Sequence, residues 1–322
     1  MKSIMEIIKQ KWLLIVATTI VFYVALILIS DVSEIFESFS KIRVELLLAI
    51  FFIGFASHIV KSLRQKQFLI MLEEKIPFYK NLLVYLAGLS LVATPGGIGV
   101  FLKSVYLKKG FQISAEKSFS VIFLERYHDL LAGTSIIFVG ILFYFEWISA
   151  LLVFFCSLLL AVLYVVLKNK RFFSFINAQV SKIKFLSEGL SNIEPGRSFA
   201  ILTKPKNMAT GWMLSVAGWS LDALAVYIVF LSLNVDLGYL LTSQIHFTAL
   251  GYGVLSMLPA GIGVNEGMAD FLLVRQGLEL AVASSVVIMM RLSTVWFATI
   301  IGLVCTRIVL KQNIGTSHPQ PT

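Results

Sequence analysis

Eight apolar runs, most of them close to twenty residues long, dominate this 322-residue chain. A helix needs about 20 apolar residues to cross a bilayer, so runs of this length predict membrane spans. Because backbone groups in lipid must satisfy one another, each run should be helical, and we expect an all-α, polytopic integral membrane protein. The composition agrees: hydrophobic residues make up 58% of the chain and charged residues 14%, against about 45–50% and about 25% in soluble domains. The runs lie near residues 12–30, 44–60, 81–99, 117–146, 148–167, 208–232, 239–258 and 281–308.

Two runs contain or lead into a proline and a group of glycines. The first sequence reads TPGGIGV from Thr94, and the second reads LPAGIGV from Leu258. Proline removes a backbone donor and glycine weakens a helix, so both sequences should end a helix within an apolar region. Non-helical backbone at membrane depth is tolerated only where protein or a wet cavity shields it. We therefore expect both breaks to lie inside the protein.

The basic residues between the runs indicate how the chain is threaded. Cytoplasmic loops carry an excess of Lys and Arg, which places the N-terminus and the loop Lys61–Lys80, including Arg64, inside. If the run 81–99 crossed fully, the segment 168–206, with eight Lys or Arg and two Glu, would lie outside. A basic segment outside would conflict with the excess of Lys and Arg in cytoplasmic loops. This conflict disappears if the runs 81–99 and 239–258 turn back as re-entrant hairpins that enter from opposite faces. We expect about six full spans, two re-entrant hairpins, and cytoplasmic N- and C-termini, in the cytoplasmic membrane of a prokaryote.

One transmembrane domain is expected to occupy residues 1–310. Within the basic loop 168–206, apolar residues between Phe172 and Ile183 share a helical face opposite two lysines. That pattern predicts an amphipathic helix lying on the cytoplasmic leaflet. The polar tail 311–322 is expected to be disordered.

The two broken regions are related by a shared spacing. Arg126 follows Pro95 by 31 positions, and Arg291 follows Pro259 by 32. With the threading above, the two repeats, about 81–146 and about 239–308, are inverted relative to each other. Inverted repeats with broken helices near the midplane are a recurring design of secondary transporters.

The breaks also predict a binding site. The glycines Gly97 and Gly99, and their counterparts Gly261 and Gly263, each precede a helix whose first amides and positive dipole end would point into the membrane interior. Such helix ends favour anions, including phosphate. The repeat thus predicts two opposed anion-binding helix ends.

Charged residues within the runs point to the same chemistry. Arg126 and Arg291 occupy matching positions, and at 1.5 Å per residue Arg126 lies on the order of 13 Å into its run. Ionisable groups at that depth face a cavity or a partner, and arginine suits bidentate binding of phosphate. The expected counter-charges are Glu125, Asp129, Asp222 or Glu266. The alternative is that all of these charges form internal salt bridges. The secondary candidates are Lys103, Asp129, Asp222 and Asn265.

These stretches resemble a known family. TPGGIGVFLKSVYL, ERYHDLL and LPAGIGVNEG, followed by the deep Arg291, are similar to the lysylphosphatidylglycerol synthase transmembrane-region family, which includes the flippase half of the multiple peptide resistance factor. The resemblance covers most of the chain and implies a flippase-like fold that moves or binds anionic lipids. In that factor an aminoacyl-transferase domain follows, and no such chemistry is expected here. The family often places a charged residue after the glycines, which Glu266 satisfies, whereas Phe101 and Leu102 stand at the first break.

We therefore expect a flippase-like transporter, not an enzyme, for an anionic lipid or a polyprenyl-phosphate-type amphiphile. A membrane-embedded lipid-modifying transferase is one alternative, since Glu125 and Asp129 share a helix face and paired carboxylates can act as acid and base. A non-transporting scaffold is the other. Further partners to consider are a lipid-synthesising enzyme and a second copy of the chain.

Other chemistry is not expected. The net charge of +9 comes largely from loops, where the threading rule explains it without a nucleic acid. Cys156 and Cys305 lie in apolar runs, and no His or Cys pair has metal-ligand spacing. We expect no metal, no cofactor and no catalytic residue. Because no nucleotide-binding motif is present, transport should be driven by a gradient, by the membrane potential or by consumption of the lipid elsewhere.

Overall fold

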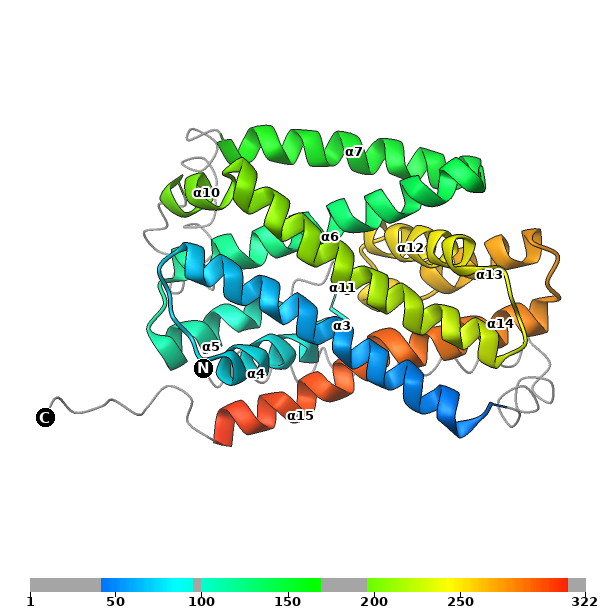
Figure 1. The fold of residues 1–322 in the computed structure, drawn as a ribbon, viewed down its shortest axis with the longest axis horizontal. Helices are drawn as coiled ribbons and strands as arrows, with labels where there is room; N and C mark the ends of the chain where they lie inside the picture. Colours follow the sequence, from blue (N-terminus) through cyan, green and yellow to red (C-terminus); the bar gives the residue numbers. More distant parts are fainter. Residues whose placement is uncertain (1–41, 95–99, 169–195, 312–322) are drawn as a thin grey trace, which may run out of the picture.

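Residues 42–94, 100–168 and 196–311 are described by a computed structural model, and within these ranges every regular element is a helix. Long helices run along the longest axis of the molecule and cross one another at moderate angles (Figure 1). The all-helical prediction is confirmed for this part of the chain. The elements are α3 (Val44–Met71), α4 (Phe78–Gly88), η1 (Leu89–Leu91), α5 (Leu102–Phe111), α6 (Ala115–Phe143), α7 (Trp147–Lys168), α10 (Gly196–Leu202), α11 (Pro205–Ser232), α12 (Tyr239–Leu255), η3 (Pro259–Gly261), α13 (Val264–Arg275), α14 (Leu280–Arg291), the π-helical turn η4 (Leu292–Trp296) and α15 (Phe297–Lys311).

Five helical segments are long and apolar enough to cross a membrane: α3, α6, α7, α11 and the continuous segment Leu280–Lys311. They correspond to five of the six runs predicted as full spans. Large apolar side chains on α7, such as Phe154, Phe155 and Leu158, are more than half exposed, as suits a surface that faces lipid. The protein is a multi-pass integral membrane protein.

Several sequence predictions fall outside the described residues. They are the first span 12–30 with the N-terminus, the glycines Gly97 and Gly99 of the first break, most of the basic loop at 169–195, and the tail 312–322.

The helices α3 and α11 pack against each other along most of their length and form the centre of the fold (Figure 1). Small residues make this close approach possible: a Cβ at Gly218 of α11 would lie 2.8 Å from the side chain of Lys61 on α3. The prediction that Lys61 and Arg64 belong to a cytoplasmic loop is wrong, because α3 continues to Met71 and buries both side chains. Lys61 pairs with Asp222 and Arg64 with Asp129 inside the protein. Because these pairs compensate the buried charges, the helix can continue past the end of its apolar run.

Two helix–break–helix units lie at opposite ends of the long axis: α4 and α5 at one end, α12 and α13 at the other (Figure 1). None of these four helices is among the segments long enough to cross a membrane. The second break has left-handed backbone at Ala260, Gly261 and Gly263, with φ of 54°, 67° and 85°. At Gly261 only glycine fits, because a Cβ would lie 2.8 Å from the Cα of Gly253.

The second break contacts the segment that leads into the first. The amide of Ala260 in the second break donates a hydrogen bond to the carbonyl of Ala93, just before the first break, at 2.9 Å. The last segment, α14–η4–α15, runs past this contact, and its π-helical turn begins directly after Arg291. Single π-turns inside helices are frequent at functional sites.

Candidate functional site

A cavity of about 510 Å³ lies between the second break and the long helices α3, α6, α7 and α11. Its wall is mostly apolar, with contributions from Leu130, Phe247, Leu250 and Val295 among others. Ligand pockets commonly combine such walls with a few placed polar groups. Seven lining residues are charged residues or histidines: His58, Lys61, Arg126, Asp129, Asp222, His246 and Arg291.

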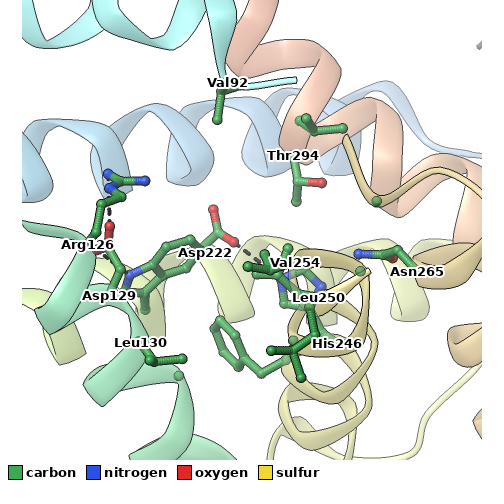
Figure 2. A pocket seen from close by; sticks show the side chains of 18 of the residues that line it. Val92, Arg126, Asp129, Leu130, Asp222, His246, Leu250, Val254, Asn265 and Thr294 are labelled. Carbon is green, nitrogen blue, oxygen red and sulfur yellow. Dashed lines mark hydrogen bonds and ion pairs between the residues drawn. The ribbon is translucent and has the colours of Figure 1, made fainter. Parts of the chain in front are cut away.

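At one end of the cavity, Asp129 of α6 holds a tight cluster (Figure 2). Its Oδ1 accepts from Arg64 Nη1 at 2.6 Å and from Trp219 Nε1 at 2.8 Å, and its Oδ2 pairs with Arg126 Nη2 at 2.9 Å. Arg64 is fully buried, whereas 35% of the Arg126 side chain remains exposed. Two cations share one carboxylate here, and Arg126 is the one that faces open space.

A second cluster lies between Asp129 and Asn265 in the same view (Figure 2). Asp222 of α11 faces His246 of α12, with Oδ2 and Nε2 3.4 Å apart, and its Oδ1 is 3.9 Å from Lys61 Nζ. Lys61 also lies 3.2 Å from the centroid of the Trp219 ring, a cation–π contact that links the two clusters. The contacts of Asp222 are long, so its charge is less well compensated than that of Asp129.

The second break is held in place by Arg291. Its Nε is 2.8 Å from Glu266 Oε1, and its Nη2 donates to the carbonyl of Ala260 at 2.6 Å. Glu266 Oε2 in turn accepts from the amide of Gly263 at 2.8 Å, at the start of α13. Only 4% of the Arg291 side chain is exposed. Its guanidinium mainly contacts Glu266 and Ala260 of the second break, although part of the side chain lines the cavity.

The first repeat contains an equivalent ion pair with the charges exchanged. Lys103, early in α5, pairs with Glu125 of α6, and both side chains are essentially fully buried. Lys103 Nζ also donates to Gln65 Oε1 at 3.0 Å. In each repeat, therefore, a buried ion pair ties the helix after the break to the following long helix.

The structure divides the residues singled out from the sequence into two groups. Arg126, Asp129, Asp222, Gly261, Asn265 and Arg291 line the cavity. Lys103, Glu125, Gly263 and Glu266 instead hold the two half-helices. Glu125 and Asp129 are paired with different cations, so they do not form one carboxylate pair.

Sequence reasoning missed five site residues: His58, Lys61, Arg64, Trp219 and His246. One signal was present on α3. Ser57, Lys61 and Arg64 follow one another at helical spacing of four and three residues and continue the phase of the preceding apolar run. A polar stripe in phase with a buried helix face predicts a buried polar cluster better than it predicts a loop.

The chain is similar to several archaeal membrane proteins. A UPF0104 membrane protein of Methanocaldococcus jannaschii is 27% identical over 235 residues, covering 68% of this chain and 94% of the relative. Another from the same organism is 24% identical over 335 residues, covering 95% and 97%. A UPF0104 membrane protein of Pyrococcus horikoshii is 32% identical over 106 residues, covering 33% and 32%.

A family match covers most of the chain. Residues 14–302 match the family described as the lysylphosphatidylglycerol synthase TM region, so the second break and all the residues that line the cavity fall within the matched range. The chain therefore belongs to the lysylphosphatidylglycerol synthase TM region family of integral membrane proteins.

Proposed function

We propose that this protein moves an anionic amphiphile between the two leaflets of a prokaryotic cytoplasmic membrane and catalyses no chemical change in it. Phospholipids, aminoacylated lipids and polyprenyl-phosphate carriers all belong to this class. The observation that carries the proposal is the position of Arg126. Its side chain lines an apolar-walled cavity and remains one-third exposed, while its Nη2 pairs with Asp129. A phosphate oxygen is the partner that a guanidinium in such a place favours.

In this proposal the headgroup enters the cavity while its apolar chains remain among the lipid-facing helices. The units α4–α5 and α12–α13 act as re-entrant hairpins from opposite faces. Their short helices and their location at opposite ends of the molecule support this arrangement. The N-terminal end of α13, where Asn265 lines the cavity, adds positive potential there, and the Glu266 carboxylate that accepts from the amide of Gly263 offsets part of it. Motion of the two repeats then exposes the headgroup to each leaflet in turn.

Reconstitution into liposomes tests the proposal. Purified protein in phosphatidylcholine liposomes with a trace of fluorescent phosphatidylglycerol should make the inner-leaflet label accessible to external dithionite. Arg126→Ala should slow this crossing at least about tenfold, the equivalent of 1.4 kcal/mol in barrier height. Arg275→Ala is the matched control, since it removes an arginine that pairs with Glu146 at 3.0 Å outside the cavity. Equal crossing by the two variants would refute the role of Arg126.

A lipid-modifying transferase is the second candidate function. The pairing of Asp222 with His246 on the cavity wall favours it, because a carboxylate that orients an imidazole is a common acid–base arrangement. Mass spectrometry of the lipids recovered from the same liposomes separates the two functions. An altered lipid that appears with the wild-type protein and not with His246→Gln would replace transport by transfer.

A further inference from the structure

The cavity contains a cluster that anion binding by Arg126 does not use. Asp222 and His246 face each other on its wall, with His58 and Lys61 beside them. Asp129 already has three short contacts, whereas among the described residues the carboxylate of Asp222 has contacts of 3.4 and 3.9 Å. Acidic and histidine side chains inside membrane proteins often form proton pathways.

The surroundings of His246 match a doubly protonated imidazole. Its Nε2 faces the carboxylate of Asp222 at 3.4 Å, and its Nδ1 faces the thioether sulfur of Met290 at 3.3 Å. Both neighbours are acceptors, the sulfur a weak one. A neutral imidazole has one N–H and satisfies only one of them, whereas an imidazolium donates to both.

The titratable and charged groups around this pair lie on α3, α6 and α14. On α3 they are His58, whose Nδ1 has no hydrogen-bond partner among the described residues, and Lys61. On α6 they are Arg126 and Asp129, which pair with each other. On α14 the neighbour is Arg291, whose charge is compensated by Glu266 of α13. Asp222, whose other oxygen lies 3.9 Å from Lys61, is thus the carboxylate that would pair with an imidazolium at His246.

We propose that the Asp222–His246 pair binds a proton that is transported together with the anionic headgroup, which makes the protein a proton–lipid symporter. The proposal rests on the transport function proposed above. The proton adds to the nitrogen of His246 that lacks hydrogen, the imidazole becomes imidazolium, and Asp222 remains a carboxylate. No other bond forms or breaks, and the proton leaves on the opposite side of the membrane.

Two features link this proton to the lipid. An imidazolium shares the cavity with Arg126, so an anionic headgroup compensates both cations, and proton and headgroup each favour binding of the other. His246 belongs to α12 of the second repeat, whereas Asp222 belongs to α11 outside it. Protonation therefore strengthens the attraction between α12 and the central helix pair. Proton binding should therefore favour positions of the second helix–break–helix unit in which α12 lies close to α11.

A pH gradient across the liposomes described above tests the proposal. With the membrane potential clamped at zero by potassium and valinomycin, one proton per lipid drives the leaflet ratio of fluorescent phosphatidylglycerol toward about tenfold per pH unit. The label should accumulate in the leaflet that faces the more alkaline side and reverse when the gradient is reversed. An equilibrating protein without coupling leaves the label evenly distributed.

Three variants assign the proton site. In His246→Gln and Asp222→Asn the final distribution of the label, read after long incubation, should no longer respond to the gradient, at whatever rate each variant moves the label. His128→Gln is the matched control, because His128 also has two acceptors, the carbonyls of Leu124 at 2.7 Å and Met208 at 3.1 Å, but does not line the cavity. It should respond to the gradient as the wild type does. If His246→Gln does not fold, Asp222→Asn decides the assignment.

The possible outcomes distinguish proton symport from the transport function on which it rests. Wild-type protein that equilibrates the label but leaves it even under a gradient, or enriches it on the acidic side, overturns symport and leaves transport standing. A gradient response retained by both His246→Gln and Asp222→Asn overturns the assigned site. A wild-type protein that moves no label overturns transport, and symport with it.

Discussion

The amide of Ala260, in the second break, donates a hydrogen bond to the carbonyl of Ala93, two residues before Pro95 in the first broken run. It places η3 against the end of the first broken run, next to the cavity that contains Arg126 and Asp222. Arg291 reinforces the contact by donating to the carbonyl of Ala260. Backbone groups of Ala260 in the second break are thus satisfied within the protein, as the low-dielectric surroundings require.

The backbone of the second break should tolerate only glycine at position 261. Gly261→Ala forces a left-handed alanine and brings its Cβ within 2.8 Å of Gly253, so we expect a loss of about 1–3 kcal/mol in stability. Gly267→Ala is the control, since a Cβ on this helical glycine would have no neighbour within 4 Å, and alanine should stabilise α13 by up to about 1 kcal/mol. Thermal unfolding in detergent measures both, and equal melting temperatures would contradict the strained geometry.

The buried ion pair between Lys103 and Glu125 should be needed for folding. Lys103→Met leaves Glu125 charged and buried without its cation, which costs about 3–5 kcal/mol in stability. The double change Lys103→Met with Glu125→Leu should recover much of that loss, because no buried charge is left uncompensated. The partly exposed pair of Lys117 with Glu74 provides the contrast, and Lys117→Met should cost at most about 1 kcal/mol. Denaturant unfolding in micelles measures the loss of stability in each variant. Equal losses in Lys103→Met and Lys117→Met would contradict the prediction.

Substitution of Arg291 should mainly lower stability, whereas substitution of Arg126 should mainly lower the rate of lipid crossing. Arg291→Ala leaves Glu266 without its partner and should lower stability by about 3–5 kcal/mol, with partial recovery on adding Glu266→Gln. Arg126→Ala removes a side chain that is one-third exposed, so the protein should remain folded while lipid crossing declines. Melting curves and transport rates from the same preparations check this. A stable Arg291→Ala protein would contradict the structural role assigned to that arginine.

The guanidinium of Arg126 should not be replaceable by an ammonium group. Arg126→Lys keeps the positive charge next to Asp129 but loses the planar donors that bind two phosphate oxygens together. We expect lipid crossing to fall about tenfold, which corresponds to about 1.4 kcal/mol. The same assay at several lipid concentrations shows whether affinity or rate is lost. Full activity of the lysine variant would show that charge alone is sufficient.

Local chemistry in the sequence was sufficient to predict much of this protein. Apolar runs of span length predicted the helices, since a bilayer imposes that length on any chain that crosses it. Proline and glycine at Pro259 and Gly261 predicted the second break, because their backbone preferences act within a few residues. The matched spacing to Arg126 and Arg291 located two deep arginines, both of which line the cavity.

Only the tertiary structure decided what each charge does. Arg64 meets Asp129 across 65 positions of sequence, so nothing local showed that α3 would continue past its apolar run and bury that arginine. Arg126 and Arg291 match in spacing, yet one faces the cavity while the other holds Glu266 and the second break. His246 gained its role from Asp222 and Met290 on two other helices. Ion pairs and cavities are formed by residues distant in sequence, and a one-dimensional pattern does not contain their distances.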